Sequence, residues 1–419
     1  MTENQQPGKY DAVLGGKNPP PVTGVVLGGI EGVKRRLSNP VTDVKIAALN
    51  DALKYDDVGL ELVIQALQSK SKRLERNAYK LLRKRKETQV KQALEHYQPW
   101  YIFERSQEYS GYSGLHLEKF ASRQIVEFDL EIGITDPENI AYKILSNYHS
   151  TASITEKLTS LLQDSQANKL EALVIGEWCE TSENDSSEII NALVNAKDKL
   201  SNLKAIFIGD IVSEECEISW IRQSDISPIL RAYPQLEILQ VRGGDGLQFN
   251  PPVRHNKLKA LIVETGGLSS ETVTQICNMN LPELEHLELW FGTEEYGGDC
   301  LIENVKPIIN DLKFPSLNYL GLCNSEFSDD IVEAIVKSPL LETISVLDLS
   351  LGNLTDKGGE FLVNCAAINE LDILNVTDNY LSKEMVSKFS KLDSQVFANH
   401  QEEAEYYDDE EYRYCSVTE

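Results

Sequence analysis

Leu284-Glu285-His286-Leu287-Glu288-Leu289 is one copy of a phrase, L-x-x-L-x-(L/I/V), that recurs along most of this 419-residue chain. Eight copies begin at residues 170, 203, 236, 258, 284, 317, 344 and 371, which places them 22 to 33 residues apart. A ninth copy is indicated upstream, at Ile125-Phe128-Leu130. The alternation within each copy is typical of a strand, and repetition at this period indicates stacked structural units.

A turn-rich stretch and then an apolar helical stretch follow most of the strand phrases. The helical stretches lie at 188–194, 227–233, 272–277, 305–309, 331–336 and 359–363. Pro234, Pro282, Pro315 and Pro339 mark the return to the next strand, because proline does not continue a helix. Parallel stacking of such units gives a curved solenoid with strands inside and helices outside. We therefore predict an α/β solenoid of about eight to nine repeats over residues 119–399.

The unit length and the helical returns resemble the ribonuclease-inhibitor-like class of leucine-rich repeats. Three longer phrases, IGDIVSEECEISW at 208–220, LELWFGTEEYGG at 287–298 and LDLSLGNLTDKG at 347–358, extend the likeness to a bacterial leucine-rich-repeat family. The resemblance covers about 165–395 and the closing R-Y-x-S-V at 413–417. It implies the fold of a binding scaffold and no particular activity.

Residues 1–97 have a different, helical pattern, with apolar residues at i, i+3 and i+4 along successive segments after Pro40. Two helix pairs in tandem resemble HEAT-type repeats. The opening, VLGGKNPPP at 13–21 and VLGGIEGVKRRL at 26–37, resembles an N-terminal module of multidomain cyanobacterial proteins. This resemblance implies an adaptor or docking role and no chemistry. We expect residues 98–118 to form a linker between this all-α part and the solenoid.

Charge divides the chain in the same way. Residues 1–100 contain 17 Lys and Arg against 11 Asp and Glu, whereas the remainder contains 23 against 55, which gives the net charge of −26. Ten basic residues lie within 70–91. The candidates for docking to an acidic surface are Lys72, Arg73, Arg76, Lys80, Arg83 and Lys84.

A solvated helix face is the simpler explanation of this basic run. Nucleic-acid binding is a weaker alternative, because only Tyr79 interleaves with the basic residues and an acidic solenoid repels polyanions.

Composition also indicates the cellular compartment of the protein. The sequence contains no run of about 18 apolar residues, so we expect no transmembrane helix. The first residues also lack the pattern of a signal peptide. Seven cysteines, an odd number with none closer than 23 residues, do not form a disulfide framework or a C-x-x-C zinc pattern. We expect a cytoplasmic protein with reduced thiols that does not bind membranes.

Side chains on the concave face follow from strand alternation. Early strands place small or apolar groups there, but the third to sixth strands place aromatic and charged ones. The candidate partner-binding residues are Arg242, Glu264, His286, Glu288, Trp290 and Tyr319. An exposed Trp and Tyr beside charges is typical of a recognition surface. The alternative is a packed surface, in which Arg242 pairs with Glu264 and an insertion or the N-terminal module covers Trp290.

The sequence offers little for catalysis. The six histidines are scattered, and His286 with Glu288 has no third metal ligand. Cys323 is expected about 10 Å from His286, too far for a catalytic pair. We expect that the protein is not an enzyme and that it binds no metal and no cofactor. The alternative is an enzyme component like the HEAT-type bilin lyases, which rests on fold resemblance alone.

The last residues, 400–419, form an acidic tail with tyrosines at 406, 407, 412 and 414. Such a segment is either solvated or caps the last repeat, and we expect a partly docked cap. Together these features predict a non-catalytic scaffold or adaptor that binds a protein or peptide on the concave face.

Overall fold

The computed structural model describes residues 29–69, 71–95, 116–147, 150–178, 181–310, 313–407 and 410–418. The chain divides into two compact units, Met1–Trp100 and Tyr101–Glu419. Most of the predicted 98–118 linker lies outside the described residues, and the predicted domain boundaries stay predictions. No helix in the described ranges combines the length and apolar composition needed to cross a bilayer.

The N-terminal unit is helical wherever it is described. Its helices are α1 (Gly29–Leu37), α2 (Thr42–Ala52), α3 (Asp56–Ala66), α4 (Lys72–Leu82) and α5 (Thr88–Glu95). Apolar residues of these helices form a core of their own, in which Leu49, Val63 and Leu82 are fully buried. Gly59 allows α3 to approach α2, since a Cβ there would lie 1.7 Å from the carbonyl oxygen of Ala52. The HEAT-like classification stays a prediction.

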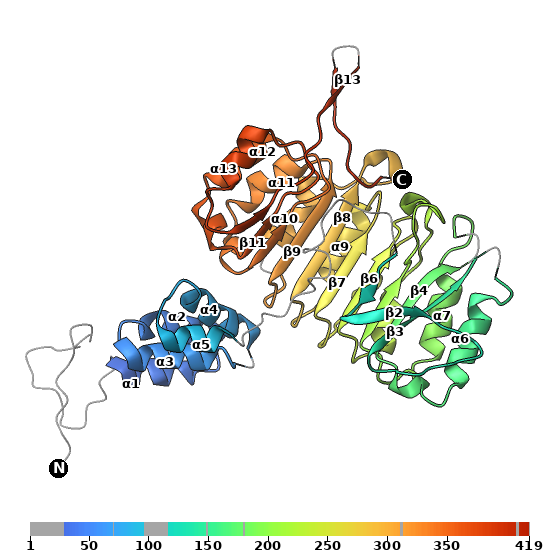
Figure 1. Cartoon of the computed structure of the whole chain (residues 1–419), viewed down its shortest axis with the longest axis horizontal. Coiled ribbons are helices and arrows are strands. Elements are labelled where there is room, and N and C mark those ends of the chain that lie inside the picture. Colours follow the sequence, from blue (N-terminus) through green and yellow to red (C-terminus); the bar gives the residue numbers. More distant parts are fainter. Residues whose placement is uncertain are drawn as a thin grey trace, which may run out of the picture. The chain divides into compact units, whose positions relative to one another are not determined.

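The strand unit contains a sheet of twelve strands that follow one another in sequence order (Figure 1). Only β1 and β2 are antiparallel; all later neighbours are parallel. The strands are β1 (Lys119–Phe120), β2 (Arg123–Glu127), β3 (Ile140–Ser146), β4 (Ala172–Trp178), β5 (Ala205–Ile208), β6 (Ile238–Arg242), β7 (Ala260–Glu264), β8 (His286–Gly292), β9 (Tyr319–Ser325), β10 (Val346–Asp348), β11 (Ile373–Asn375) and β12 (Gln395–Phe397).

All eight main copies of the phrase coincide with strands, β4 to β11. The ninth copy is displaced: β2 begins two residues before Ile125, and Leu130 lies beyond its end with 47% of its surface exposed. The strands β3 and β12 carry no copy of the phrase, so periodicity did not reveal them.

Helices return the chain from one strand to the next along one face of the sheet (Figure 1). They are α6 (Ile154–Gln163), α7 (Ser187–Asn195), α8 (Ser227–Ala232), α9 (Ser270–Asn278), α10 (Ile302–Asn310), α11 (Ser328–Ile335), α12 (Asp356–Val363) and α13 (Lys383–Phe389). Each predicted helical stretch coincides with one of them. Shorter 3-10 turns lie at Ala167–Lys169, Ile218–Trp220, Glu294–Tyr296, Pro339–Glu342 and Ala366–Glu370. The alternating strand–helix solenoid is thus confirmed, and it fits the leucine-rich-repeat class.

The core lies between the sheet and these helices. The second leucine of successive phrases, as in Leu239, Leu261, Leu287 and Leu320, is fully buried in it. Serine and threonine side chains cap several helices; Ser153, for example, forms a reciprocal capping box with Glu156 at the start of α6. The opposite face of the sheet, which we call the concave face, is therefore the one that remains for function.

The C-terminal residues turn away from the sheet and then return to it. β13 (Glu405–Tyr407) pairs with β14 (Glu410–Tyr412) in a hairpin that projects from the strand unit (Figure 1). After the hairpin, residues 413–418 lie against residues of the strand unit. The tail is thus partly docked, but the expected cap is not formed by its tyrosines, because Tyr406, Tyr412 and Tyr414 are 67%, 38% and 52% exposed.

Candidate functional site

Strand register brings the polar residues of the concave face together. Arg242 at the end of β6 is the register partner of Glu264 on β7. His286 on β8 is the partner of Tyr319 on β9, and Tyr319 is the partner of Val346 on β10. Because parallel neighbours keep side chains on the same face in line, a row of polar groups crosses the sheet from β3 to β11.

The first group on this row surrounds Asp210, which follows β5. Lys143 Nζ donates to Asp210 Oδ2 at 2.9 Å, and His116 Nδ1 lies 3.5 Å from the same oxygen. Burial opposes the ionisation of Asp210, but His116 and Lys143 outweigh it and lower the pKa of Asp210 to about 2. Hydrogen bonds to Asp210 and Glu215 raise the pKa of His116 to about 9. This group ties the segment before β1 to the middle of the sheet.

The second group is a buried ion pair. Arg242 Nε donates to Glu264 Oε2 at 2.8 Å, and Gln240 Nε2 donates to Glu264 Oε1 at 2.7 Å. Arg242 Nη1 donates to the carbonyl oxygen of Ile211 at 2.7 Å, while its guanidinium lies 5.5 Å from the ring centre of Phe207. The pair is therefore satisfied by hydrogen bonds on both sides, as a buried pair requires.

The third group centres on Glu288 of β8. Trp290 Nε1 donates to Glu288 Oε1 at 2.8 Å, and His286 Nε2 lies 3.1 Å from Glu288 Oε2. The imidazole of His286 stacks on the Tyr319 ring, with centroids 3.8 Å apart and planes 8° from parallel. His286 Nδ1 is buried and has no hydrogen-bond partner within the described ranges. The Glu288 carboxylate and the rings of Trp290, His286 and Tyr319 consequently form one cluster.

The fourth group centres on Asp348 of β10. Its carboxylate accepts hydrogen bonds from the hydroxyl of Tyr319 at 2.7 Å, the hydroxyl of Ser350 at 2.6 Å and the amide of Asn375 at 3.0 Å. Burial, followed by the nearby Glu288 carboxylate, raises the pKa of Asp348. Tyr319 thus joins the third and fourth groups.

Residues 413–418 lie beyond the carboxyl ends of β8 to β10. The main-chain N–H of Val417 donates to Asn324 Oδ1 at 3.0 Å, and Asn324 Nδ2 donates back to the carbonyl oxygen of Val417. The N–H of Ser416 donates to the carbonyl oxygen of Leu351 at 2.9 Å. The Val417 side chain packs in an apolar cluster with Ile218, Trp290, Cys323 and Leu351. The C-terminal segment and the turn at Ile218 therefore cover Trp290.

All six predicted partner-binding residues are buried, with 0% to 3% of their surface exposed: Arg242, Glu264, His286, Glu288, Trp290 and Tyr319. The expectation of an exposed Trp and Tyr is wrong for this conformation, because other parts of the chain cover the face. Of the packed-surface alternative, the pair of Arg242 and Glu264 is present, but the residues packed against Trp290 include Val417 of the C-terminal segment, which was not predicted. Their role in partner binding stays a prediction.

The predicted basic docking residues lie on α4 and just after it. Arg73 forms an ion pair of 2.6 Å with Asp43, and Arg76 is buried. Of the others, Lys84 is exposed, whereas nothing is described of the Lys72 side chain. None of Arg76, Lys80, Arg83 and Lys84 is without an interaction partner. Docking to an acidic surface by this helix stays a prediction.

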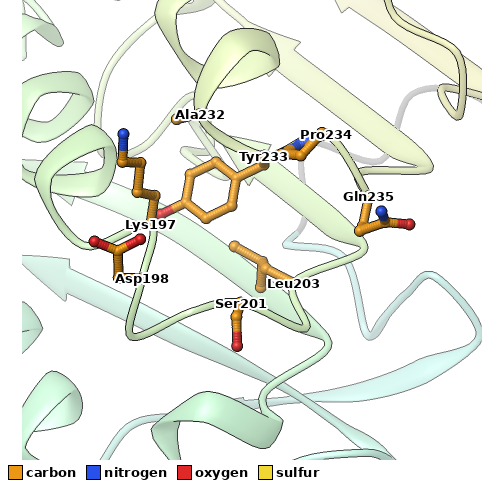
Figure 2. Close-up of a pocket in the computed structure, with 8 residues that line it drawn as sticks. All are labelled: Lys197, Asp198, Ser201, Leu203, Ala232, Tyr233, Pro234 and Gln235. Atoms are coloured by element: carbon orange, nitrogen blue, oxygen red, sulfur yellow. The ribbon is translucent and has the colours of Figure 1, made fainter.

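A small cavity of about 270 Å³ lies at the turns that precede β5 and β6 (Figure 2). Its lining residues are Lys197, Asp198, Ser201, Leu203, Ala232, Tyr233, Pro234 and Gln235. The Tyr233 hydroxyl already donates to the carbonyl oxygen of Leu193 at 2.5 Å. The cavity lies apart from the four polar groups, and its side chains suggest no particular ligand.

Chemistry on the concave face is restricted by burial. Burial, with Asp348 and Glu288 nearby, raises the pKa of the Cys323 thiol well above its usual value, so Cys323 is a poor nucleophile. The described ranges contain no group of three His, Cys, Asp or Glu residues placed to hold a metal ion. The arrangement is instead suited to hold a chain segment through hydrogen bonds and apolar contacts.

Several residues that shape this face were not singled out from the sequence. Lys143 lies on a strand without the repeat phrase, and Asp210 lies in a loop. Asn324 contacts Val417 across 93 residues of sequence. The closing R-Y-x-S-V phrase was a signal for the docked segment, but its partner could not be found without the register of β9.

No family model and no curated protein matches the chain. Among solved structures, a protein from Bacteroides fragilis is 32% identical, and the match covers 62% of this chain and 75% of that one with a TM-score of 0.57. An internalin from Listeria monocytogenes is 14% identical, and that match covers 67% of this chain and 87% of the internalin. Its TM-score of 0.29 is too low to carry an argument. By its identity to the Bacteroides fragilis protein over three quarters of that protein's length, the chain belongs to the same family as that protein.

Proposed function

We propose that this protein is a non-catalytic interaction scaffold that binds a protein or peptide on the concave face of a ribonuclease-inhibitor-like leucine-rich-repeat solenoid. In this proposal no cofactor takes part. The HEAT-like N-terminal unit is an adaptor that docks on an acidic surface through its basic helix. One observation carries the proposal: the strand unit already holds a chain segment, residues 413–418, by hydrogen bonds to its main chain.

The polar groups of the concave face support this function physically. Glu288 and Asp348 are fixed by Trp290, Tyr319 and Ser350 before any partner arrives. Groups that are already ordered lose little conformational entropy on binding, which favours affinity. Trp and Tyr are also the side chains that most often dominate binding energy at interfaces.

Quantitative affinity capture with the full-length protein tests the proposal. Glu288→Gln keeps the size of the buried side chain, and Trp290→Phe keeps an aromatic ring but removes the indole N–H; both alter the third polar group. If a partner lies against this group, each variant captures it at least about ten-fold more weakly than the wild type. Trp220→Phe is the matched control, since Trp220 is 58% exposed on a neighbouring turn. An unchanged set of captured proteins from folded Glu288→Gln and Trp290→Phe variants would reject the concave face as the binding site.

A further inference from the structure

The C-terminal segment identifies the kind of partner that this face accepts. We infer that the site beyond the carboxyl ends of β8 to β10 binds a peptide of another protein with the pattern small residue, any residue, aliphatic residue. Residues 415–417 occupy the site as an internal substitute for that peptide. The inference rests on the proposed function and gives its partner a chemical description. We call this site the peptide slot, defined by Gly266, Trp290, Asn324, Leu351 and Tyr380.

The main-chain contacts of the slot do not depend on the sequence of the occupant. Asn324 uses both amide atoms on the main chain of Val417, and Leu351 accepts from the N–H of Ser416. The Tyr380 hydroxyl accepts from the N–H of Tyr414 at 2.8 Å and lies 3.0 Å from the carbonyl oxygen of Tyr414. These hydrogen bonds can hold any chain that adopts the same backbone conformation, because main-chain groups are common to all peptides.

The side chains of the occupant define the pattern. Cys415 and Val417 are 5% and 2% exposed, whereas Tyr414 is 52% exposed and Ser416 is also exposed. The buried side chains at positions 415 and 417 therefore contact the slot, and the exposed side chain at position 416 does not. The Val417 position requires a medium aliphatic group, because it packs against Ile218, Trp290 and Cys323.

The solenoid side of the slot has no room for a side chain at position 266. A Cβ on Gly266 would lie 2.4 Å from the carbonyl oxygen of Thr418, closer than any ordinary contact. The backbone of the occupant therefore approaches the turn after β7 directly, which only glycine permits.

The internal occupant can leave without disturbing the core of the solenoid. Cys415 and Val417 do not belong to the main apolar core, which is built from the strands and helices. The segment is connected through the hairpin of β13 and β14, where Tyr406 is 67% exposed. A two-stranded hairpin alone is only marginally stable in water, so it offers little resistance to release. A peptide from outside thus competes with residues 413–418 for the same slot.

Fluorescence anisotropy with a labelled peptide of residues 411–418, EYRYCSVT, tests the inference on full-length protein. Val417→Asp places a charge in the apolar cluster and should free the slot, whereas Ser416→Asp places the same charge in solvent. We expect the Val417→Asp protein to bind the peptide. The wild type and the Ser416→Asp protein should bind at least about ten-fold more weakly, because their own segment keeps the slot filled.

Peptide variants provide the matching readout. The peptide with Val417→Asp should not bind the Val417→Asp protein, and the peptide with Ser416→Asp should bind within about three-fold of the unmodified one. Adding Asn324→Ala to the Val417→Asp protein should remove binding. A chain that ends after Tyr412 serves as a second acceptor if Val417→Asp does not fold.

The outcomes separate the inference from the proposed function. The inference is overturned if a folded acceptor binds no peptide, or if wild type and acceptor bind it equally well. The proposed function fails instead if the acceptor binds the peptide, yet Glu288→Gln and Trp290→Phe do not change the capture of any protein. If these variants do change capture but the peptide does not compete with the captured protein, the scaffold function stands and the peptide slot is rejected.

Discussion

Burial determines how much each charged residue of the concave face contributes to stability. Arg242 and Glu264 form a pair with side chains 2% and 0% exposed. Lys259 and Glu237 form an ion pair of 2.6 Å where the same two strands, β7 and β6, begin, and their side chains are 31% and 34% exposed. Geometry alone does not distinguish these pairs, but solvent screens only the second one.

Glu264→Gln should therefore destabilise the strand unit far more than Glu237→Gln. Removing one member of a buried pair costs about 3–5 kcal/mol, whereas removing a half-exposed member costs about 1 kcal/mol or less. Urea denaturation monitored by circular dichroism gives both free energies of unfolding. Replacing both residues, as in Arg242→Met with Glu264→Leu, should recover most of the loss. Equal effects of the two single substitutions would show that the Arg242–Glu264 pair is hydrated.

The group around Asp210 should make stability depend on pH in a defined window. The pKa of Asp210 is lowered from 3.8 to about 2, so its contribution is present above pH 3.8 and is lost as the pH falls through 2. The pKa of His116 is raised from 6.5 to about 9, so its contribution is present below pH 6.5 and is lost as the pH rises through 9. Both contributions to stability are therefore fully present only between pH 3.8 and pH 6.5.

Unfolding measurements at pH 2.5, 5.5 and 9.5 check this window. The difference in unfolding free energy between wild type and Asp210→Asn should be largest at about pH 5.5 and smaller at about 2.5 and 9.5. Glu283→Gln is the control, because Glu283 is exposed, and its difference should vary little. A difference for Asp210→Asn that is the same at all three values would contradict the assigned contacts.

At the scale of elements, short-range patterns predicted more than long-range contacts. The phrase containing Leu287 and the helical stretch of α9 follow from local alternation and periodicity, and both are present. The strand β3 was missed because Ile140–Ser146 lacks the second leucine of the phrase, although it pairs in register with β2 and β4.

The state of the concave face was harder to predict for a physical reason. Strand alternation correctly placed Trp290 away from the leucine core, but burial also depends on segments remote in the sequence. Val417 reaches Asn324 across 93 residues, and Lys143 reaches Asp210 across 67 residues. No local pattern contains such pairs, so only the packed-face alternative allowed for them.

At the scale of the whole strand unit, the C-terminal segment differs from the repeats that it contacts. Repeats of a solenoid contact mainly their neighbours, so stability is built up from one unit to the next. Residues 413–418 instead touch Gly266 after β7, Trp290 on β8, Asn324 on β9 and Leu351 after β10. The segment thus crosses several repeats and covers the residues proposed to bind partners.

Hydrogen exchange of the full-length protein tests this central feature most directly. The N–H groups of Tyr414, Ser416 and Val417 donate to Tyr380, Leu351 and Asn324, so they should exchange at least about ten-fold more slowly than the N–H of exposed Glu403. In the Val417→Asp protein this protection should disappear, while that of the β8 and β9 amides persists. If the N–H groups of Tyr414, Ser416 and Val417 in the wild type exchange as fast as that of Glu403, the segment does not dock beyond the carboxyl ends of β8 to β10 and the peptide slot has no internal occupant.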